Sequence, residues 1–183
     1  IYHGLTYGAA PRSALEVSDD VFVINSFSKY FGMTGWRLGW LVAPSSCVRE
    51  VEKLAQNLFL CAPAPAQRAA LAAFTPENIA ILEGRRAEFR RRRDFLVPAL
   101  RELGFVIGTA PEGAFYVYAD SSRFAADSFV FCRRLLEEAG VAITPGVDFG
   151  EHRAAAHVRL AYTTSMENLQ EGVARIARFV ARG

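Results

Sequence analysis

The sequence predicts an α/β fold for the first part of the chain and a smaller α+β module for the second. Three patterns lead to this prediction. The apolar, β-branched run of residues 21–24 is typical of a strand buried on both faces. A long apolar stripe then predicts a helix over residues 76–104. From residue 105 onward, short apolar runs alternate with helical patterns.

Composition restricts the class of protein. Of the 183 residues, 51% are hydrophobic and 22% charged, and the net charge is only +2, which is typical of a soluble globular protein. No apolar run has the length needed to span a bilayer, so no membrane partner is expected. The widely spaced cysteines Cys47, Cys61 and Cys132 indicate neither a disulfide framework nor a zinc site. A reducing cytoplasm fits them best.

The first part contains two predicted strands and two short helices. Residues 21–25 form the first strand, and residues 37–43 form a second that is antiparallel to it. Ser45 is the predicted N-cap of the next helix. Prolines make residues 58–65 a loop, and residues 67–74 follow as an alanine-rich helix.

The long helix is predicted from its ends. Thr75 caps it, Pro76 is its first residue and Gly104 ends it. Pro98 lies inside and predicts a kink where one domain meets the next. The domain organisation we expect is therefore 1–75, a connecting helix 76–104, and a small domain 105–183.

The small domain is predicted as alternating strands and helices. A helix over residues 127–139 ends at Gly140, and the last helix starts at Thr164 with a capping box to Glu167. The predicted strands are residues 105–107, 114–118, 141–143 and 158–162.

The chemistry is concentrated in residues 26–39, directly after the first strand. Ser26, Ser28 and Lys29 lie at the carboxyl end of that strand, where open α/β folds bind ligands. Arg37 adds a planar double donor suited to a phosphate or carboxylate. A lysine beside phosphate donors is suited to a Schiff base with pyridoxal phosphate. The spacing alone leaves open the alternative that Lys29 is a solvated loop lysine and Arg37 a surface charge.

The segment SFSKYFGMTGWRLGW resembles the cofactor-lysine segment of the class I/II aminotransferases, the fold-type I pyridoxal phosphate enzymes related to aspartate aminotransferase. The resemblance implies that Lys29 is the catalytic Schiff-base lysine and that Ser26, Ser28 and Arg37 contact the cofactor phosphate. It extends along nearly the whole chain, but only to the second half of the family's chain. The fold it implies is the remainder of the large cofactor-binding domain, with a mixed sheet, plus the small α+β domain.

Tyr2 gains a role only through this resemblance. The chain opens at Ile1 and Tyr2, apparently within an apolar element, so we expect it to be a fragment that is inactive alone. In the family the matching tyrosine binds the ring hydroxyl of the cofactor, after a strand that carries an aspartate partner for the pyridine nitrogen. The residues alone favour an amphipathic ring at a strand edge.

Arg159 stands in an otherwise apolar predicted strand, where a guanidinium needs an anion. The residues alone favour an ion pair slightly, whereas VRLAYT resembles the segment in which the family's arginine binds the substrate α-carboxylate. Gly113 and Tyr118 lie in PEGAFYVYAD, which resembles the substrate-side strand, although a turn glycine and a packed aromatic are the favoured explanation. We expect residues 146–151 to form a mobile segment over the site.

Two other patterns are given no functional role. His152 and His157 lack a convincing third ligand, so no metal is predicted. The arginines of residues 90–93 spread around the helix and have Glu88 and Asp94 nearby, which argues against nucleic acid as a partner.

The resemblance implies an enzyme that transfers an amino group from an amino acid to a 2-oxo acid with pyridoxal phosphate, and that is a homodimer when full length. Two alternatives stay open. One is a pyridoxal phosphate-dependent lyase or cyclising synthase of the same fold, and the other is a non-enzymatic binding module that uses the arginine-rich helix. The sequence leaves the amino donor undetermined.

Overall fold

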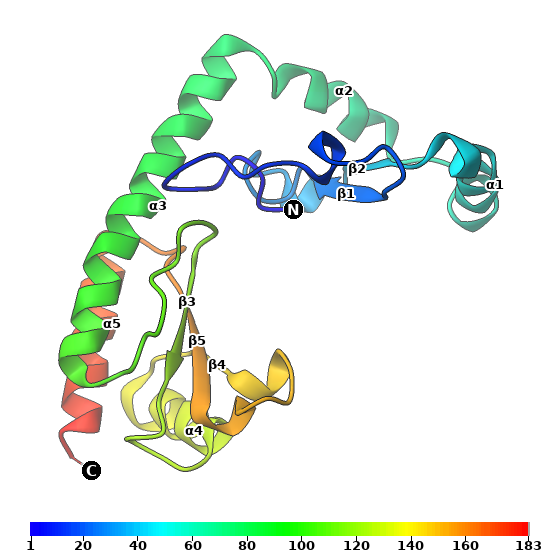
Figure 1. Ribbon diagram of the computed structural model, residues 1–183. Helices are drawn as coiled ribbons and strands as arrows, with labels where there is room; N and C mark the ends of the chain where they lie inside the picture. Colours follow the sequence, from blue (N-terminus) through cyan, green and yellow to red (C-terminus); the bar gives the residue numbers. More distant parts are fainter. Residues whose placement is uncertain (183) are drawn as a thin grey trace. The chain divides into compact units, whose positions relative to one another are not determined.

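A computed structural model describes residues 1–182, which divide into two compact units (Figure 1). Unit 1 is Ile1–Ala87, and unit 2 begins at Glu88. The division lies inside the longest helix, α3 (Pro76–Leu103), and not at Pro98, which was expected to mark it. The helix continues through Pro98, and the burial of Val97 and Leu100 in the same turn offsets the lost backbone hydrogen bond.

Unit 1 is built on a two-stranded sheet of β1 (Val23–Ser26) and β2 (Gly39–Val42). The strands pair antiparallel, as predicted, with Ser26 opposite Gly39. The remaining elements of unit 1, besides the start of α3, are short helices: η1 (Ala14–Glu16), η2 (Thr34–Trp36), η3 (Ser45–Cys47), α1 (Val48–Leu58) and α2 (Ala64–Ala72).

The prediction that the first strand is buried on both faces is wrong for this structure. Ile24 in β1 is 67% exposed, and all four residues of β2 are exposed. Burial on both faces requires a layer on each face, and the described part of unit 1 pairs only two strands.

Two helix boundaries in unit 1 also differ from the prediction. Ser45 opens the turn η3 without a side-chain cap, and α1 starts only at Val48. Helix α2 begins at Ala64, with Pro65 in its first turn, where the missing N–H of proline is tolerated. The predicted loop and the helix after it are therefore both shifted toward the N-terminus.

The core of unit 1 joins the segment after β1 to α2. Its buried members are Phe27, Met33, Leu38, Ala66 and Ala70. The ring of Phe27 lies 4.9 Å from that of Phe31 and 5.1 Å from that of Trp40, measured between centroids. Anchoring Phe27 fixes the backbone of the two serines on either side of it, which form part of the candidate site.

The first half of α3 holds the start of the chain and the segment after β1. Thr75 caps the helix as predicted, since its Oγ1 accepts from the Asn78 N–H at 3.4 Å. The Tyr30 hydroxyl donates to Glu83 at 2.6 Å, and Arg86 donates to the Thr6 carbonyl at 2.9 Å. Burial, followed by the bond to the Glu83 carboxylate, raises the pKa of Tyr30 to about 12.

Unit 2 has a three-stranded antiparallel sheet in the order β3-β5-β4, with α4 and α5 packed against each other. Its elements besides the end of α3 are β3 (Tyr116–Asp120), α4 (Ser128–Ala139), β4 (Thr144–Pro145), η4 (Gly146–Asp148), η5 (Ala154–Ala156), β5 (His157–Ala161) and α5 (Met166–Val180). Its largest fully buried side chains include Leu100, Val117, Leu135, Val158 and Tyr162.

The strands of unit 2 are shorter or later than predicted. Residues 105–107 contribute only an isolated bridge from Val106 to Asp120. The left-handed φ of 56° at Ala114 bends the chain, so β3 starts at Tyr116. Residues 141–143 are not a strand, and β4 is the next two residues. Strand β5 covers 157–161 where 158–162 was predicted.

The helices of unit 2 follow the prediction more closely. Asp127 caps α4 by accepting from the backbone N–H groups of the first turn, and Gly140 ends it with a φ of 65°. The cap of α5 is Ser165 and not Thr164, since the Ser165 Oγ accepts from the Asn168 N–H at 3.2 Å.

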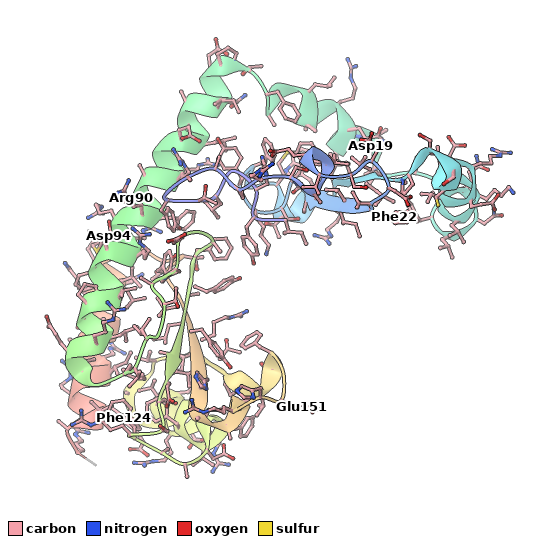
Figure 2. All side chains as sticks on the ribbon, viewed as in Figure 1. Asp19, Phe22, Arg90, Asp94, Phe124 and Glu151 are labelled. Atoms are coloured by element: carbon pink, nitrogen blue, oxygen red, sulfur yellow. The ribbon has the colours of Figure 1, made fainter. Side chains whose placement is uncertain are left out.

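The arginine-rich stretch of α3 is compensated locally, as predicted. Glu88 accepts from Arg91 and from Arg92, each at 2.8 Å, and these bonds lower its pKa to about 2. Figure 2 labels Arg90 and Asp94 on this helix, where Asp94 also accepts from Arg93 at 2.6 Å. In residues 1–182 no helix is both long and apolar enough to cross a membrane.

Candidate active site

The segment that follows β1 is closed by hydrogen bonds between its own residues. The Ser28 N–H donates to the Ser26 Oγ at 3.0 Å. The Thr34 hydroxyl donates to the Ser28 carbonyl at 2.6 Å. Thr34 was not singled out from the sequence, yet it fixes the turn that carries Ser28 and Lys29.

Arg37 returns the chain from this segment to β2. Its backbone is left-handed, with a φ of 53°, a conformation that costs a non-glycine residue free energy and is concentrated at functional sites. The guanidinium Nη1 donates to the Thr34 carbonyl at 2.8 Å. This bond uses one of the five donors of an arginine side chain. Because the residue is exposed, its other donors can bind an anion.

Gly39 brings the two ends of the segment together. It faces Ser26 across the β1–β2 pair, and a Cβ on Gly39 would lie 2.6 Å from the Asn25 carbonyl oxygen. Only glycine allows this approach without moving the strands. Ser26, Ser28, Lys29 and Arg37 therefore belong to one structured turn.

Lys29 lies beside Tyr2, a neighbour that is distant in the sequence. Its Nζ is 5.6 Å from the centroid of the Tyr2 ring, within the range of a cation–π contact. The chain turns directly after Tyr2, where the Leu5 N–H donates to the Tyr2 carbonyl at 2.9 Å. The structure thus joins the two predicted cofactor residues.

Arg159 belongs to unit 2, where β5 places it between Tyr118 of β3 and Thr144 of β4. The guanidinium carbon lies 4.2 Å from the ring centroids of both Tyr116 and Phe149. Its Nε is buried and has no hydrogen-bond partner among residues 1–182. No salt bridge of the described residues includes Arg159.

The other aromatic groups of unit 2 form a stack beside Arg159. Tyr118 is 44% exposed and its ring lies parallel to that of His157 at 4.9 Å, so it is not a core aromatic. The rings of Tyr118 and Phe149 are nearly perpendicular, with their centroids 6.3 Å apart. Sequence reasoning missed Tyr116 and Phe149. An aromatic residue shortly after the Pro145-Gly146 turn was the available signal for the second.

Matches to known proteins agree with this fold. The model of the family described as aminotransferase class I and II matches residues 1–176, so the chain belongs to that family. Its members use pyridoxal phosphate.

Among curated proteins, the chain is 43% identical to a valine–pyruvate aminotransferase of Mycobacterium tuberculosis over 98% of its own length and 47% of that protein. It is 38% identical to an aspartate/prephenate aminotransferase of Thermus thermophilus, over 100% of its length and 47% of that protein. A crystal structure of an aminotransferase from M. tuberculosis matches with a TM-score of 0.94 at 43% identity, over 100% of this chain and 48% of that one. The chain thus spans about half the length of the curated relatives it matches.

Proposed function

We propose that the intact protein transfers an amino group from an amino acid to a 2-oxo acid with pyridoxal phosphate as cofactor. The observation that carries the proposal is the single turn after β1, which holds a lysine, two serines and an arginine. The names of the relatives support the reaction class, because both are aminotransferases.

The residues of the turn fit the cofactor. Two hydroxyls and a guanidinium form a donor set suited to a phosphate dianion, and Ser26, Ser28 and Arg37 would supply them. The Ser26 Oγ accepts from a backbone N–H, which leaves its own proton free for an acceptor. Lys29, beside the Tyr2 ring, is the amine that would hold the cofactor covalently.

Each residue then has a separate task. Bound pyridoxal phosphate supplies the electron sink for carbanion chemistry. The amine of Lys29 would be the base that removes the proton from the amino acid Cα. Arg159, whose buried Nε has no hydrogen-bond partner among residues 1–182, would bind the α-carboxylate and so orient the amino acid.

We also propose a homodimer in a reducing cytoplasm. Large exposed hydrophobic side chains in unit 1, such as Ile24, Leu58 and Leu60, support association with further protein surface. The cysteines Cys47, Cys61 and Cys132 are free thiols, which supports a reducing compartment.

Borohydride reduction tests the assignment. The intact protein is incubated with pyridoxal phosphate, reduced, digested and mapped, and the pyridoxyl group should lie on Lys29. Lys29→Ala should lose this label together with amino transfer between an amino acid and a 2-oxo acid. Lys53→Ala is the matched control, since Lys53 lies on the exposed helix α1 and pairs with Glu50. A label on Lys53 would contradict the proposal.

A further inference from the structure

The guanidinium of Arg159 packs against two aromatic rings. Its central carbon is 4.2 Å from the Tyr116 centroid and 4.2 Å from the Phe149 centroid. Both distances are within the range of a cation–π contact, so both rings pack against the guanidinium and restrict its orientation.

The rings confine the guanidinium but supply no acceptor for it. Nε is buried without a hydrogen-bond partner among residues 1–182, which carries a free-energy cost. A carboxylate lying in the guanidinium plane accepts two parallel N–H bonds, the geometry that satisfies such donors. The arrangement suits a planar carboxylate.

The ring of Phe149 is fixed by the turn before it. The Phe149 N–H donates to the Gly146 carbonyl at 2.9 Å. Gly146 is buried, and a Cβ there would lie 2.4 Å from the Ala154 carbonyl oxygen, so the turn packs directly on the backbone beside β5. Tyr118 supports the Phe149 ring by an edge contact at 6.3 Å. The segment of residues 146–151 thus places one aromatic side chain, Phe149, against Arg159.

We propose that Phe149 and Tyr116 are positioning residues that hold the Arg159 guanidinium in the plane required by the substrate α-carboxylate. The inference rests on the proposed function. Cation–π contacts of this kind contribute enough for the loss of one ring to weaken carboxylate binding about tenfold. Loss of the ring should weaken binding of the carboxylate and leave the reaction at the amino group unchanged.

The test uses the intact protein loaded with pyridoxal phosphate and the variant Phe149→Leu. The KM for an amino acid should rise about tenfold while kcat changes little. Reaction with a primary amine of the same side chain but no carboxylate should be unaffected. Phe149→Tyr keeps the ring and should restore the KM. Phe129→Leu, the same change at another exposed phenylalanine of unit 2, should have no effect.

Binding of propanoate, measured by calorimetry, gives a readout that does not depend on turnover. Phe149→Leu should weaken it about tenfold. If propanoate binding weakens but the wild-type protein transfers no amino group, the proposed function fails, and only the support of carboxylate binding at Arg159 by the Phe149 ring stands. An unchanged KM and unchanged propanoate binding, or equal slowing of the reaction with the amine, would overturn it. Should Phe149→Leu fail to fold by circular dichroism, Phe149→Met carries the same expectations.

Discussion

Unit 1 and unit 2 bury their apolar side chains to very different degrees. In unit 2 the sheet and helices enclose Leu100, Val117 and Leu135, each with essentially no exposed surface. In unit 1, by contrast, Ile24 is 67% exposed, Leu58 75% and Leu60 80%. Unit 1 nevertheless holds the turn with Lys29 and Arg37. The region with the most specific sequence pattern is thus the one that completes its own core least.

The contrast shows that a local site and a stable fold can have separate origins. The turn of residues 26–37 is held by hydrogen bonds within itself and by a small cluster around Phe27. Stability requires enough apolar area removed from water, at about 25 cal/mol per Å², to offset chain entropy. Unit 2 meets that requirement more nearly than unit 1.

The largest effect expected from this difference is in the folding of the separated parts. Residues 76–183, which include all of α3, should fold cooperatively because unit 2 encloses its own core. Residues 1–75 should give no cooperative transition, because the sheet has two strands and exposed faces. Urea titrations followed by circular dichroism measure both. If residues 1–75 unfolded as cooperatively as residues 76–183, the two units would not differ in how well they fold alone.

A smaller effect is expected when one methyl group is added within unit 2. Gly146→Ala places a Cβ against two carbonyl oxygens, those of Ala154 at 2.4 Å and His157 at 2.7 Å, so the turn must shift. Overpacking of this kind should lower the free energy of unfolding by about 1–3 kcal/mol. Because the turn carries Phe149, it should also raise the KM for the amino acid. Urea unfolding of residues 76–183 measures the stability, and steady-state kinetics of the intact protein measure the KM.

Gly172→Ala is the matched control for this change. Gly172 lies within α5, and nothing is within 4 Å of the position its Cβ would take. Alanine there should stabilise unit 2 by about 0.5–1 kcal/mol, because it is the better helix former. If the two variants had equal stability, the close packing of the turn would not be a constraint.

Local signals in the sequence predicted the elements that local chemistry determines. Asp127 and Gly140 mark the ends of α4 because a cap and a left-handed residue act within one turn. The antiparallel pairing of β1 and β2 followed from the short connection between two apolar runs. The cap of α5 was misplaced by one residue, since Thr164 and Ser165 offer the same hydroxyl chemistry and tertiary packing chooses between them.

Features that depend on distant partners could not be predicted in the same way. The exposure of Ile24 depends on which layers cover the sheet, and a β-branched run does not indicate whether such layers are present. The stacking of Phe149 on Arg159 joins residues on a turn and a strand through tertiary packing alone. The roles of Lys29 and Arg159 came from resemblance, because a lysine after a strand and an arginine within one have several uses.

The smallest expected effect is a dependence of stability on pH that is confined to unit 1. The pKa of Tyr30 is raised to about 12 by burial and by its bond to Glu83, from an ordinary value of 10.0. A raised pKa means that the stabilisation is fully present below pH 10 and is lost as the pH rises through about 12. Ionised Tyr30 would lose its hydrogen bond and face the Glu83 carboxylate.

Tyr30→Phe should therefore destabilise unit 1 by about 1 kcal/mol at pH 8 and remove part of the loss of stability above pH 10. Chemical unfolding of the intact protein between pH 8 and 12, followed by a probe in unit 1, measures the difference from wild type. Tyr118→Phe in unit 2 is the control, since Tyr118 has no hydrogen bond to a carboxylate among the described residues. If wild type and Tyr30→Phe lost stability in parallel above pH 10, the Tyr30–Glu83 bond would contribute nothing to holding the site turn against α3.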